Sequence, residues 1–125
     1  MSRALKLLVV DDEEIVRYPL LAILKRLGHH AEGEQDGLAG LHSIEKGDYD
    51  AVFVDVRMPG LNGIDLLCRA KELRPEIRIV MMSGGGFDDT RKEAMQKGAF
   101  AFVQKPLRIA DLQELTKKIS SSLST

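Results

Sequence analysis

Residues 51–63 read AVFVDVRMPGLNG, and this stretch decides the fold. Its first part, Ala51–Val54, is a short and continuous apolar run, which is typical of a strand buried on both faces of a parallel sheet. Asp55 ends the run, at a position where an unpaired charge is costly. The Asn62-Gly63 pair favours a turn. The stretch therefore predicts a central buried strand that carries a carboxylate to the edge of a sheet.

Strand and helix patterns alternate on both sides of this stretch. Three more apolar runs predict buried strands: Leu5–Val10, Ile77–Met82 and Ala99–Val103. A more polar run, His30–Glu34, predicts an edge strand. Three predicted helices are Glu14–Leu27, Ile64–Leu73 and Arg108–Ser120. Two more are predicted from their caps: one is capped by Asp36 and runs to Lys46, and the other is capped by Asp88 or Asp89 and ends at Gly98. The alternation predicts an α/β fold, with a doubly wound five-stranded parallel sheet in the order 2-1-3-4-5 and helices on both faces.

The composition is that of an ordinary globular protein. Its 125 residues fit one domain, and 44% are hydrophobic and 30% charged. We expect residues 1–125 to form a single domain with a frayed Ser-rich tail over residues 120–125. Eighteen Lys and Arg residues against nineteen Asp and Glu residues give a net charge of −1 without a basic run, so we expect no nucleic acid to be bound. Without a signal-peptide pattern or a long apolar run, the sequence predicts a cytoplasmic protein that binds no membrane.

Polar side chains follow the predicted strands. Asp11 and Asp12 come after the first strand and Asp55 after the third. Ser83 follows the fourth strand and Lys105 the fifth. Each alone could be a helix cap, a turn residue or a solvated side chain. In an open parallel sheet, however, ligands bind beyond the carboxyl ends of the strands where the strand order reverses, so we expect all five side chains to meet at one edge.

The charges at this edge predict its chemistry. Two carboxylates about 4 Å apart repel each other by roughly 4 kcal/mol at an effective dielectric of 20, so three of them need a cation. Hard oxygen ligands that leave positions open for water and phosphate oxygens favour Mg²⁺. A metal beside a carboxylate nucleophile, with a hydroxyl and an ammonium group nearby, is suited to phosphoryl transfer onto an aspartate. The predicted cofactor is therefore Mg²⁺.

Four motifs together resemble the receiver domain of two-component response regulators over nearly the whole chain. They are Val9-Val10-Asp11-Asp12-Glu13, the stretch VDVRMPGLNG over residues 54–63, Met82-Ser83-Gly84, and Lys105-Pro106. The resemblance implies a flavodoxin-like fold that accepts a phosphoryl group on Asp55 from a phosphohistidine. It further implies that the chain is not an enzyme, because it would catalyse only its own phosphorylation and dephosphorylation.

The resemblance assigns the metal ligands residue by residue. Asp12, Asp55 and the backbone carbonyl of Arg57 would bind Mg²⁺ directly, and Asp11 would act through water. Arg57 and Gly85 occupy the two positions that tune the lifetime of the phosphoryl group in this family.

The resemblance also implies a switch. Ser83 would hydrogen-bond a phosphoryl oxygen, and Lys105 would pair with the phosphoryl charge. Phe102 matches the aromatic residue that turns inward when the hydroxyl residue moves towards the phosphoryl group. The Lys105-Pro106 peptide is expected to be cis.

The implied partners are a sensor histidine kinase or a phosphotransfer protein, which supplies the phosphoryl group, and a downstream output protein or domain. The output would be reached through the face of the fourth helix, fifth strand and fifth helix, and phosphorylation could produce a homodimer. The chain ends just after the fifth predicted helix. It is therefore either a stand-alone receiver or a module of a longer regulator, and the sequence leaves both alternatives open.

Other classes of protein fit less well. A nucleotide-binding enzyme would need a G-x-G-x-x-G turn or a Gly-Lys-Ser/Thr motif, and the sequence has neither. A dehalogenase-type phosphatase would need a second aspartate two residues after its nucleophile, where this chain has Arg57. A degenerate receiver that serves only as a scaffold remains an alternative, although every acidic, hydroxyl and lysine position is filled. Treatment with a small phosphodonor would distinguish such a scaffold from a receiver that accepts a phosphoryl group.

Overall fold

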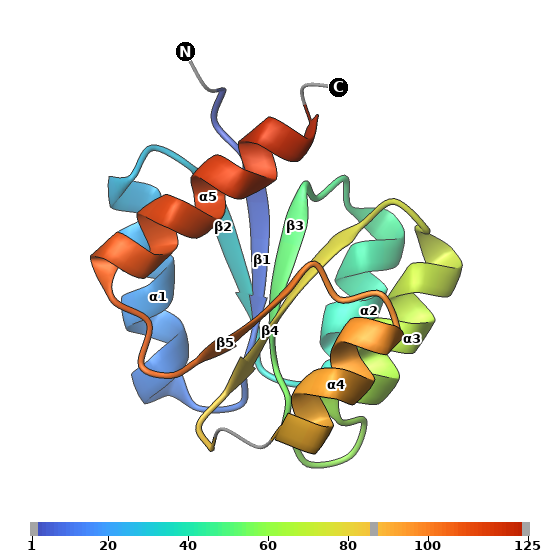
Figure 1. The fold of residues 1–125 in the computed structure, drawn as a ribbon. Helices are drawn as coiled ribbons and strands as arrows, with labels where there is room; N and C mark the ends of the chain where they lie inside the picture. Colours follow the sequence, from blue (N-terminus) through green and yellow to red (C-terminus); the bar gives the residue numbers. More distant parts are fainter. Residues whose placement is uncertain (1–2, 86–87, 124–125) are drawn as a thin grey trace.

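A five-stranded sheet lies between two layers of helices in the computed structural model, which describes residues 3–85 and 88–123 (Figure 1). The strands are β1 (Lys6–Val10), β2 (His30–Glu34), β3 (Ala51–Asp55), β4 (Arg78–Ser83) and β5 (Ala101–Gln104). All neighbouring strands are parallel, and their order is β2-β1-β3-β4-β5. The predicted fold class and strand order are confirmed.

The helices cover both faces of the sheet. They are α1 (Glu14–Arg26), α2 (Gly37–Lys46), α3 (Gly63–Leu73), α4 (Asp88–Gln96) and α5 (Ile109–Leu123). Successive side chains of a strand point to opposite faces, so Val52 and Val54 of β3 enter the core beneath α2 and α3, whereas Phe53 enters the core beneath α1 and α5. Every residue of β3 is buried, as predicted for a central strand. Among the described residues, no helix is long and apolar enough to cross a membrane.

The junction of α4 and β5 differs from its prediction. The helix ends at Gln96 rather than at Gly98, and the strand begins at Ala101 rather than at Ala99. The reason is a closing turn: the amide of Ala99 donates to the carbonyl of Ala94 at 3.0 Å, and Gly98 adopts a φ of +99°. This pattern is typical of a helix C-terminus with a left-handed glycine, and it uses the amide that the strand would need.

Other predicted bounds also need correction. Asp88 and Asp89 are the first two residues of α4, and the position before them lies outside the described residues. The fourth strand is shifted by one residue, because the amide of Ile77 is used in a turn with the carbonyl of Arg74 and Ser83 joins the ladder with β5. Helices α1, α3 and α5 begin or end one residue from a predicted bound.

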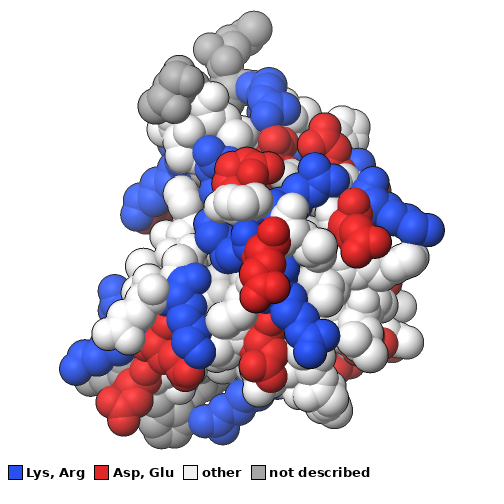
Figure 2. All heavy atoms as spheres, turned by 90° about the vertical axis from the view of Figure 1, so that its right-hand side faces the viewer, with Lys and Arg blue, Asp and Glu red and all other residues white. Residues whose placement is uncertain are grey.

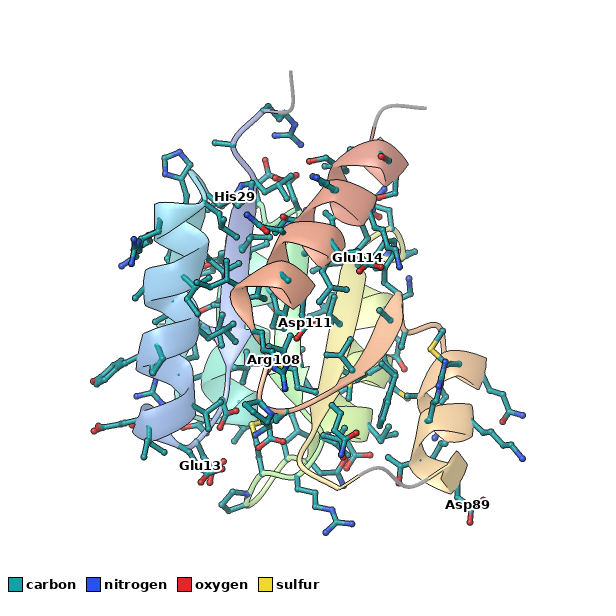
Figure 3. All side chains as sticks on the ribbon, turned by 60° about the vertical axis from the view of Figure 1, so that its left-hand side comes forward. Glu13, His29, Asp89, Arg108, Asp111 and Glu114 are labelled. Atoms are coloured by element: carbon teal, nitrogen blue, oxygen red, sulfur yellow. The ribbon has the colours of Figure 1, made fainter. Side chains whose placement is uncertain are left out.

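The predicted frayed tail is wrong for residues 120–123. Helix α5 continues to Leu123, and the guanidinium group of Arg78 donates to the hydroxyl and to the carbonyl of Ser122, the latter at 3.1 Å. At its other end, α5 starts after Arg108, whose amide donates to Asp111 Oδ2 at 2.9 Å (Figure 3). Residues 124 and 125 of the predicted tail lie outside the described residues.

Two local predictions are confirmed. The side chain of Asp36 caps α2 by accepting a hydrogen bond from the amide of Ala39 at 2.7 Å. The Lys105-Pro106 peptide is cis.

Candidate functional site

The strand register brings four chain segments to one edge of the sheet. Three pairs of residues mark this edge: Val10 with Val54, Asp55 with Met82, and Ser83 with Gln104. Asp11 directly follows β1 and Lys105 directly follows β5. The parallel ladder therefore places the carboxyl ends of β1, β3, β4 and β5 side by side, as the sequence predicted.

Four acidic side chains gather there. Asp11, Asp12, Glu13 and Asp55 each offer a carboxylate oxygen, and these oxygens all lie within 4.8 Å of one another. Asp11 and Asp55 are buried, whereas Asp12 and Glu13 are exposed. The cluster therefore has one side in the protein and one side in solvent. The prediction missed Glu13 as a site residue, although a third consecutive acidic residue was a signal that could have identified it.

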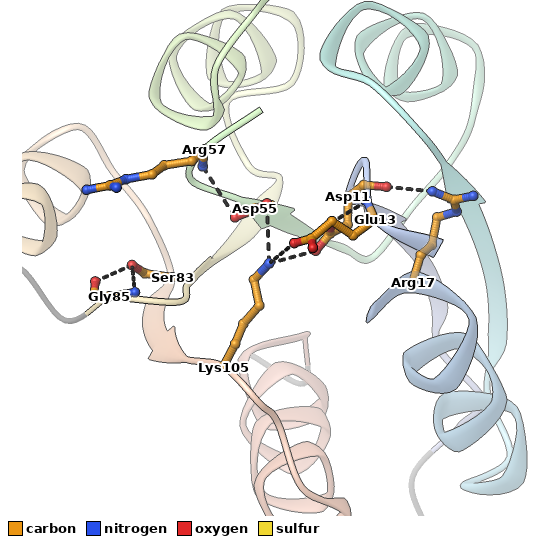
Figure 4. Close-up of polar contacts among 8 residues, drawn as sticks. All are labelled: Asp11, Glu13, Arg17, Asp55, Arg57, Ser83, Gly85 and Lys105. Carbon is orange, nitrogen blue, oxygen red and sulfur yellow. Dashed lines mark hydrogen bonds and ion pairs between the residues drawn. The ribbon is translucent and has the colours of Figure 1, made fainter. Parts of the chain in front are cut away.

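Lys105 neutralises part of this negative charge (Figure 4). Its ammonium nitrogen lies 3.0 Å from Asp11 Oδ2, 3.3 Å from Asp55 Oδ2 and 3.9 Å from Glu13 Oε1. Burial lowers the pKa of Lys105, but the hydrogen bond to Asp11 and the charges of Asp55 and Asp11 outweigh burial, so the pKa is raised overall. The ammonium group is therefore charged at neutral pH and stands next to the carboxylate that was predicted to be phosphorylated.

Asp55 is held from two sides. Its Oδ2 faces Lys105, and its Oδ1 accepts a hydrogen bond from the backbone amide of Arg57 at 3.3 Å. Burial nevertheless raises the pKa of Asp55, and the charge of Asp11 raises it further against the opposing charge of Lys105. The ionised carboxylate is thus less stable here than in water, and an additional cation would relieve that cost.

The loop after β3 packs closely against Asp55. The Asn62 side chain caps α3 by accepting a hydrogen bond from the amide of Asp65 at 3.0 Å, and the amide of Gly63 donates to the carbonyl of Val56 at 2.9 Å. A Cβ atom on Gly63 would meet the Asp55 carbonyl and lie 2.7 Å from the Cα of Val56. Only glycine therefore lets α3 begin this close to the end of β3.

The predicted switch residues lie on neighbouring strands. Ser83 is buried, and its hydroxyl donates to the carbonyl of Gly85 and accepts from the amide of Gly85 at 3.2 Å. Phe102 is partly buried against the core beneath α2 and α3, and it lines a cavity of about 560 Å³ between α4, β5 and α5. In this structure the hydroxyl therefore faces its own loop, and the aromatic ring borders open space.

A second cavity, of about 570 Å³, opens beside Arg57 between the β3–α3 loop and α4. Its charged lining residues are Arg57, Asp65, Glu93 and Lys97, of which Glu93 and Lys97 form an ion pair at 3.1 Å. Basic and acidic side chains are interspersed over this side of the molecule (Figure 2). The cavity therefore offers both signs of charge and does not select an anion or a cation.

The fold and the site define a class of protein. The family model described as "Response regulator receiver domain" matches residues 7–117, so the chain belongs to the receiver domain family of two-component response regulators. It is 34% identical to the chemotaxis protein CheY-3 of Vibrio cholerae, over 98% of this chain and 97% of that protein. It is 31% identical to the sporulation initiation phosphotransferase F of Bacillus subtilis, over 90% and 91% respectively.

Longer relatives and solved structures agree with this assignment. The chain is 34% identical to the DNA-binding transcriptional regulator NtrC of Azospirillum brasilense over 98% of its own length, but it spans only 25% of that protein. A CheY-like receiver domain protein from Methanospirillum hungatei superposes with a TM-score of 0.90 at 27% identity, covering 96% of both chains. The receiver domain of NtrX from Brucella abortus superposes with a TM-score of 0.88 at 32% identity, covering 94% of this chain and 99% of that one.

Proposed function

We propose that this receiver accepts a phosphoryl group on Asp55 in a Mg²⁺-dependent reaction. The observation that carries the proposal is the arrangement around this buried carboxylate. It lies 3.3 Å from the ammonium group of Lys105 and within 4.8 Å of carboxylate oxygens of Asp11, Asp12 and Glu13. A nucleophile, a fixed cation and a set of hard oxygen ligands thus stand at one place.

Asp55 is the nucleophile in this proposal. One of its carboxylate oxygens attacks the phosphorus of a phosphohistidine, so that an O–P bond forms while the P–N bond breaks and the imidazole nitrogen leaves with the electron pair. Lys105 balances the negative charge that Asp55 gains. The hydroxyl of Ser83 leaves Gly85 and donates to a phosphoryl oxygen.

The acidic cluster fits Mg²⁺ by its chemistry, because it offers hard carboxylate oxygens with one side open to water and phosphoryl oxygens. Asp12, Asp55 and the backbone carbonyl of Arg57 would hold the ion directly. Asp11 is fully buried and already bonded to Lys105, which supports an outer role through water. When bound, the ion offsets the charge of the incoming phosphoryl group.

We further propose that phosphorylation is read out on the face formed by α4, β5 and α5. When Ser83 moves towards the phosphoryl group, it vacates space beneath α4, and the partly buried ring of Phe102 turns into that space. The cavity that Phe102 lines then changes shape. Converting a mostly inactive ensemble into a mostly active one takes about 5.5 kcal/mol, and charge-assisted hydrogen bonds together with the metal supply this.

Receiver domains work with histidine kinases and output domains. For this chain we propose a sensor histidine kinase or a phosphotransfer protein as the donor, an output protein or domain as the target, and a homodimer as one phosphorylated form. Its relatives include a chemotaxis protein and a much longer transcriptional regulator, so stand-alone and modular forms both fit. We place it in the cytoplasm and propose that it acts on no substrate but itself and binds neither nucleic acid nor membrane.

Acetyl phosphate labelling in the presence of Mg²⁺, with acid quenching and intact-mass measurement, tests the proposal. The wild type should gain one phosphoryl group, and Asp55→Asn should gain none. Asp65→Asn, which changes an exposed aspartate at the start of α3, is the matched control and should be labelled like the wild type. A labelled Asp55→Asn protein would refute the assignment of the acceptor, and an unlabelled wild type would indicate a degenerate receiver.

Amide NMR spectra with Mg²⁺ and beryllofluoride test the readout. Chemical shifts should change from the loops at Asp55 and Ser83 as far as α4, β5 and the start of α5. Changes confined to the loops would show that this receiver does not signal through that face.

A further inference from the structure

Arg17 is a buried, charged residue that the proposed reaction does not use. It lies on α1 and is only 6% exposed. Its guanidinium group donates a hydrogen bond to the backbone carbonyl of Asp11 at 2.7 Å (Figure 4). Burying a charge is costly unless the charged group is hydrogen-bonded. The bond to the Asp11 carbonyl therefore helps to compensate the buried guanidinium group, and it links α1 to the acidic loop.

Two hydrogen bonds tie the acidic loop of residues 11–13 to the start of α1, and a third lies within the loop. The guanidinium group of Arg17 holds the Asp11 carbonyl, and the backbone amide of Arg17 donates to the Glu13 carbonyl at 2.9 Å. The amide of Glu13 in turn donates to Asp11 Oδ1 at 3.0 Å. The Arg17 side chain therefore fixes the loop at Asp11, whereas the bond to Glu13 is the regular helical bond that the amide of any residue here would make.

The carboxylates of the acidic loop repel one another and the carboxylate of Asp55. The loop carries three of the four carboxylates that lie within 4.8 Å of one another, and like charges at this distance repel strongly. Asp11 is bonded to Lys105, but Asp12 is exposed and could move outward into solvent. Main-chain anchors that keep Asp12 beside Asp55 would therefore raise the affinity of the site for a cation.

We propose that Arg17 is a positioning residue for the divalent-cation site, which holds the acidic loop in its binding geometry before the ion arrives. The inference rests on the proposed function, because it concerns the same Mg²⁺ site. Arg17 acts through the backbone carbonyl of Asp11 and touches neither the ion nor the phosphoryl group. Groups that orient metal ligands typically change metal affinity by about 10- to 100-fold when they are lost.

Strand β2 leaves room for the Arg17 side chain. A Cβ atom on Gly33 would lie 3.1 Å from the Cδ of Arg17 and 2.9 Å from the Cδ1 of Leu21. Gly33→Ala therefore displaces the stem of Arg17 without removing a charge or changing a carboxylate. It perturbs the same anchor from a different element of the fold.

Charge and positioning predict opposite effects on Mg²⁺ affinity. Arg17 is a cation beside an anionic cluster, so its removal should strengthen Mg²⁺ binding if only its charge matters. Removal should weaken binding if Arg17 holds the loop. The sign of the change therefore distinguishes the two roles.

The test is a Mg²⁺ titration of the full chain, followed by the amide NMR shifts of the loops at Asp55. Arg17→Met should weaken binding about tenfold, Arg17→Lys less, and Gly33→Ala about threefold. Leu24→Val is the matched control, because it removes a methylene from the buried face of α1 and leaves the acidic loop intact. It should lower the urea midpoint without changing Mg²⁺ affinity.

A second readout separates affinity from chemistry. At saturating Mg²⁺, the rate of labelling of Arg17→Met by acetyl phosphate should return to within about twofold of the wild-type rate, because the residue acts through binding. Unchanged or tighter Mg²⁺ binding by Arg17→Met would overturn the inference. If Arg17→Met does not fold, Gly33→Ala is used instead, and unchanged or tighter Mg²⁺ binding by Gly33→Ala would overturn the inference. A wild type that binds no Mg²⁺ would overturn the proposed function together with the inference, whereas normal binding by all the variants overturns the inference alone.

Discussion

Replacing Asp55 by asparagine should stabilise the metal-free protein, although Asp55 is the proposed phosphoryl acceptor. The substitution keeps the shape of the side chain and removes one negative charge. At an effective dielectric of 20, two charges 4.8 Å apart, the limit of separation in the acidic cluster, interact by about 3.5 kcal/mol. At 3.3 Å, the distance to Lys105, the attraction is about 5 kcal/mol. Lys105 therefore offsets the repulsion from Asp11, and repulsion from Asp12 and Glu13 opposes the attraction that is left.

Burial of the carboxylate then decides the sign. Burial is the main reason why the pKa of Asp55 is raised above its ordinary value of 3.8. A raised pKa means that the folded protein holds this proton more tightly than the unfolded chain does. Stability is therefore lost as the pH rises from 3.8 through the folded pKa, and the loss persists at neutral pH. We expect Asp55→Asn to raise the free energy of unfolding at pH 7, by on the order of 1 kcal/mol, the size typical of a single substitution.

Urea unfolding followed by far-ultraviolet circular dichroism provides the assay, since the chain has no tryptophan. Asp48→Asn makes the same chemical change at an exposed position and should alter the free energy of unfolding by less than about 0.5 kcal/mol. In EDTA, the free energy of unfolding should be higher for Asp55→Asn than for the wild type, and this difference should become smaller towards pH 4. The difference should also become smaller in excess Mg²⁺, because the ion stabilises the wild type by mass action. A lower free energy of unfolding for Asp55→Asn than for the wild type in EDTA would refute the reasoning.

Three further outcomes are expected. Arg57→Ala should speed the decay of the phosphoprotein, because the long side chain crowds the attacking water; unchanged or slower decay contradicts this. His29, at the opposite end of the molecule from the site (Figure 3), accepts a hydrogen bond from the amide of Leu5 at 3.0 Å, and burial lowers its pKa below 6.5. Its contribution to stability is therefore present above pH 6.5 and lost as the pH falls through the folded pKa, so His29→Gln should flatten the pH dependence of urea unfolding below 6.5. Gly63→Ala should lower the free energy of unfolding by about 3 kcal/mol, measured by the same method, because its Cβ meets the backbone of Asp55.

The sheet could be predicted because its signals are local. Continuous apolar runs such as Ala51–Val54 mark strands that are buried on both faces, and the connections between parallel strands leave few possible topologies. The ends of the helices were harder to predict from the sequence, because contacts with distant residues determine where a helix ends. Ser120–Ser122 has the composition of a frayed tail, yet the guanidinium group of Arg78, 44 residues earlier in the chain than Ser122, holds the last turn of α5.

The same distinction separates the site residues that were predicted from those that were missed. Asp11 and Lys105 directly follow strands and Asp55 ends one, and strand ends can be located from the sequence. Glu13 and Arg17 lie in a loop and on a helix, where an acidic or basic residue usually means solvated surface. Only side-chain geometry shows that Arg17 reaches back to the carbonyl of Asp11. Likewise, the turn of the Ser83 hydroxyl towards Gly85 has no signature in the sequence.

Groups of the protein itself compensate the buried carboxylates of the site. Asp11, the most deeply buried of them, is compensated from within the protein, since Lys105 holds its carboxylate and Arg17 holds its carbonyl. Asp12 is left at the surface, where solvent screens its charge. Lys105 also holds Asp55, so under the proposed function an arriving Mg²⁺ would take over part of that contact and leave the ammonium group available to the phosphoryl oxygens. The site would then work by exchanging one cation for another, and this exchange would let the folded chain keep the proposed nucleophile buried before its reaction partner arrives.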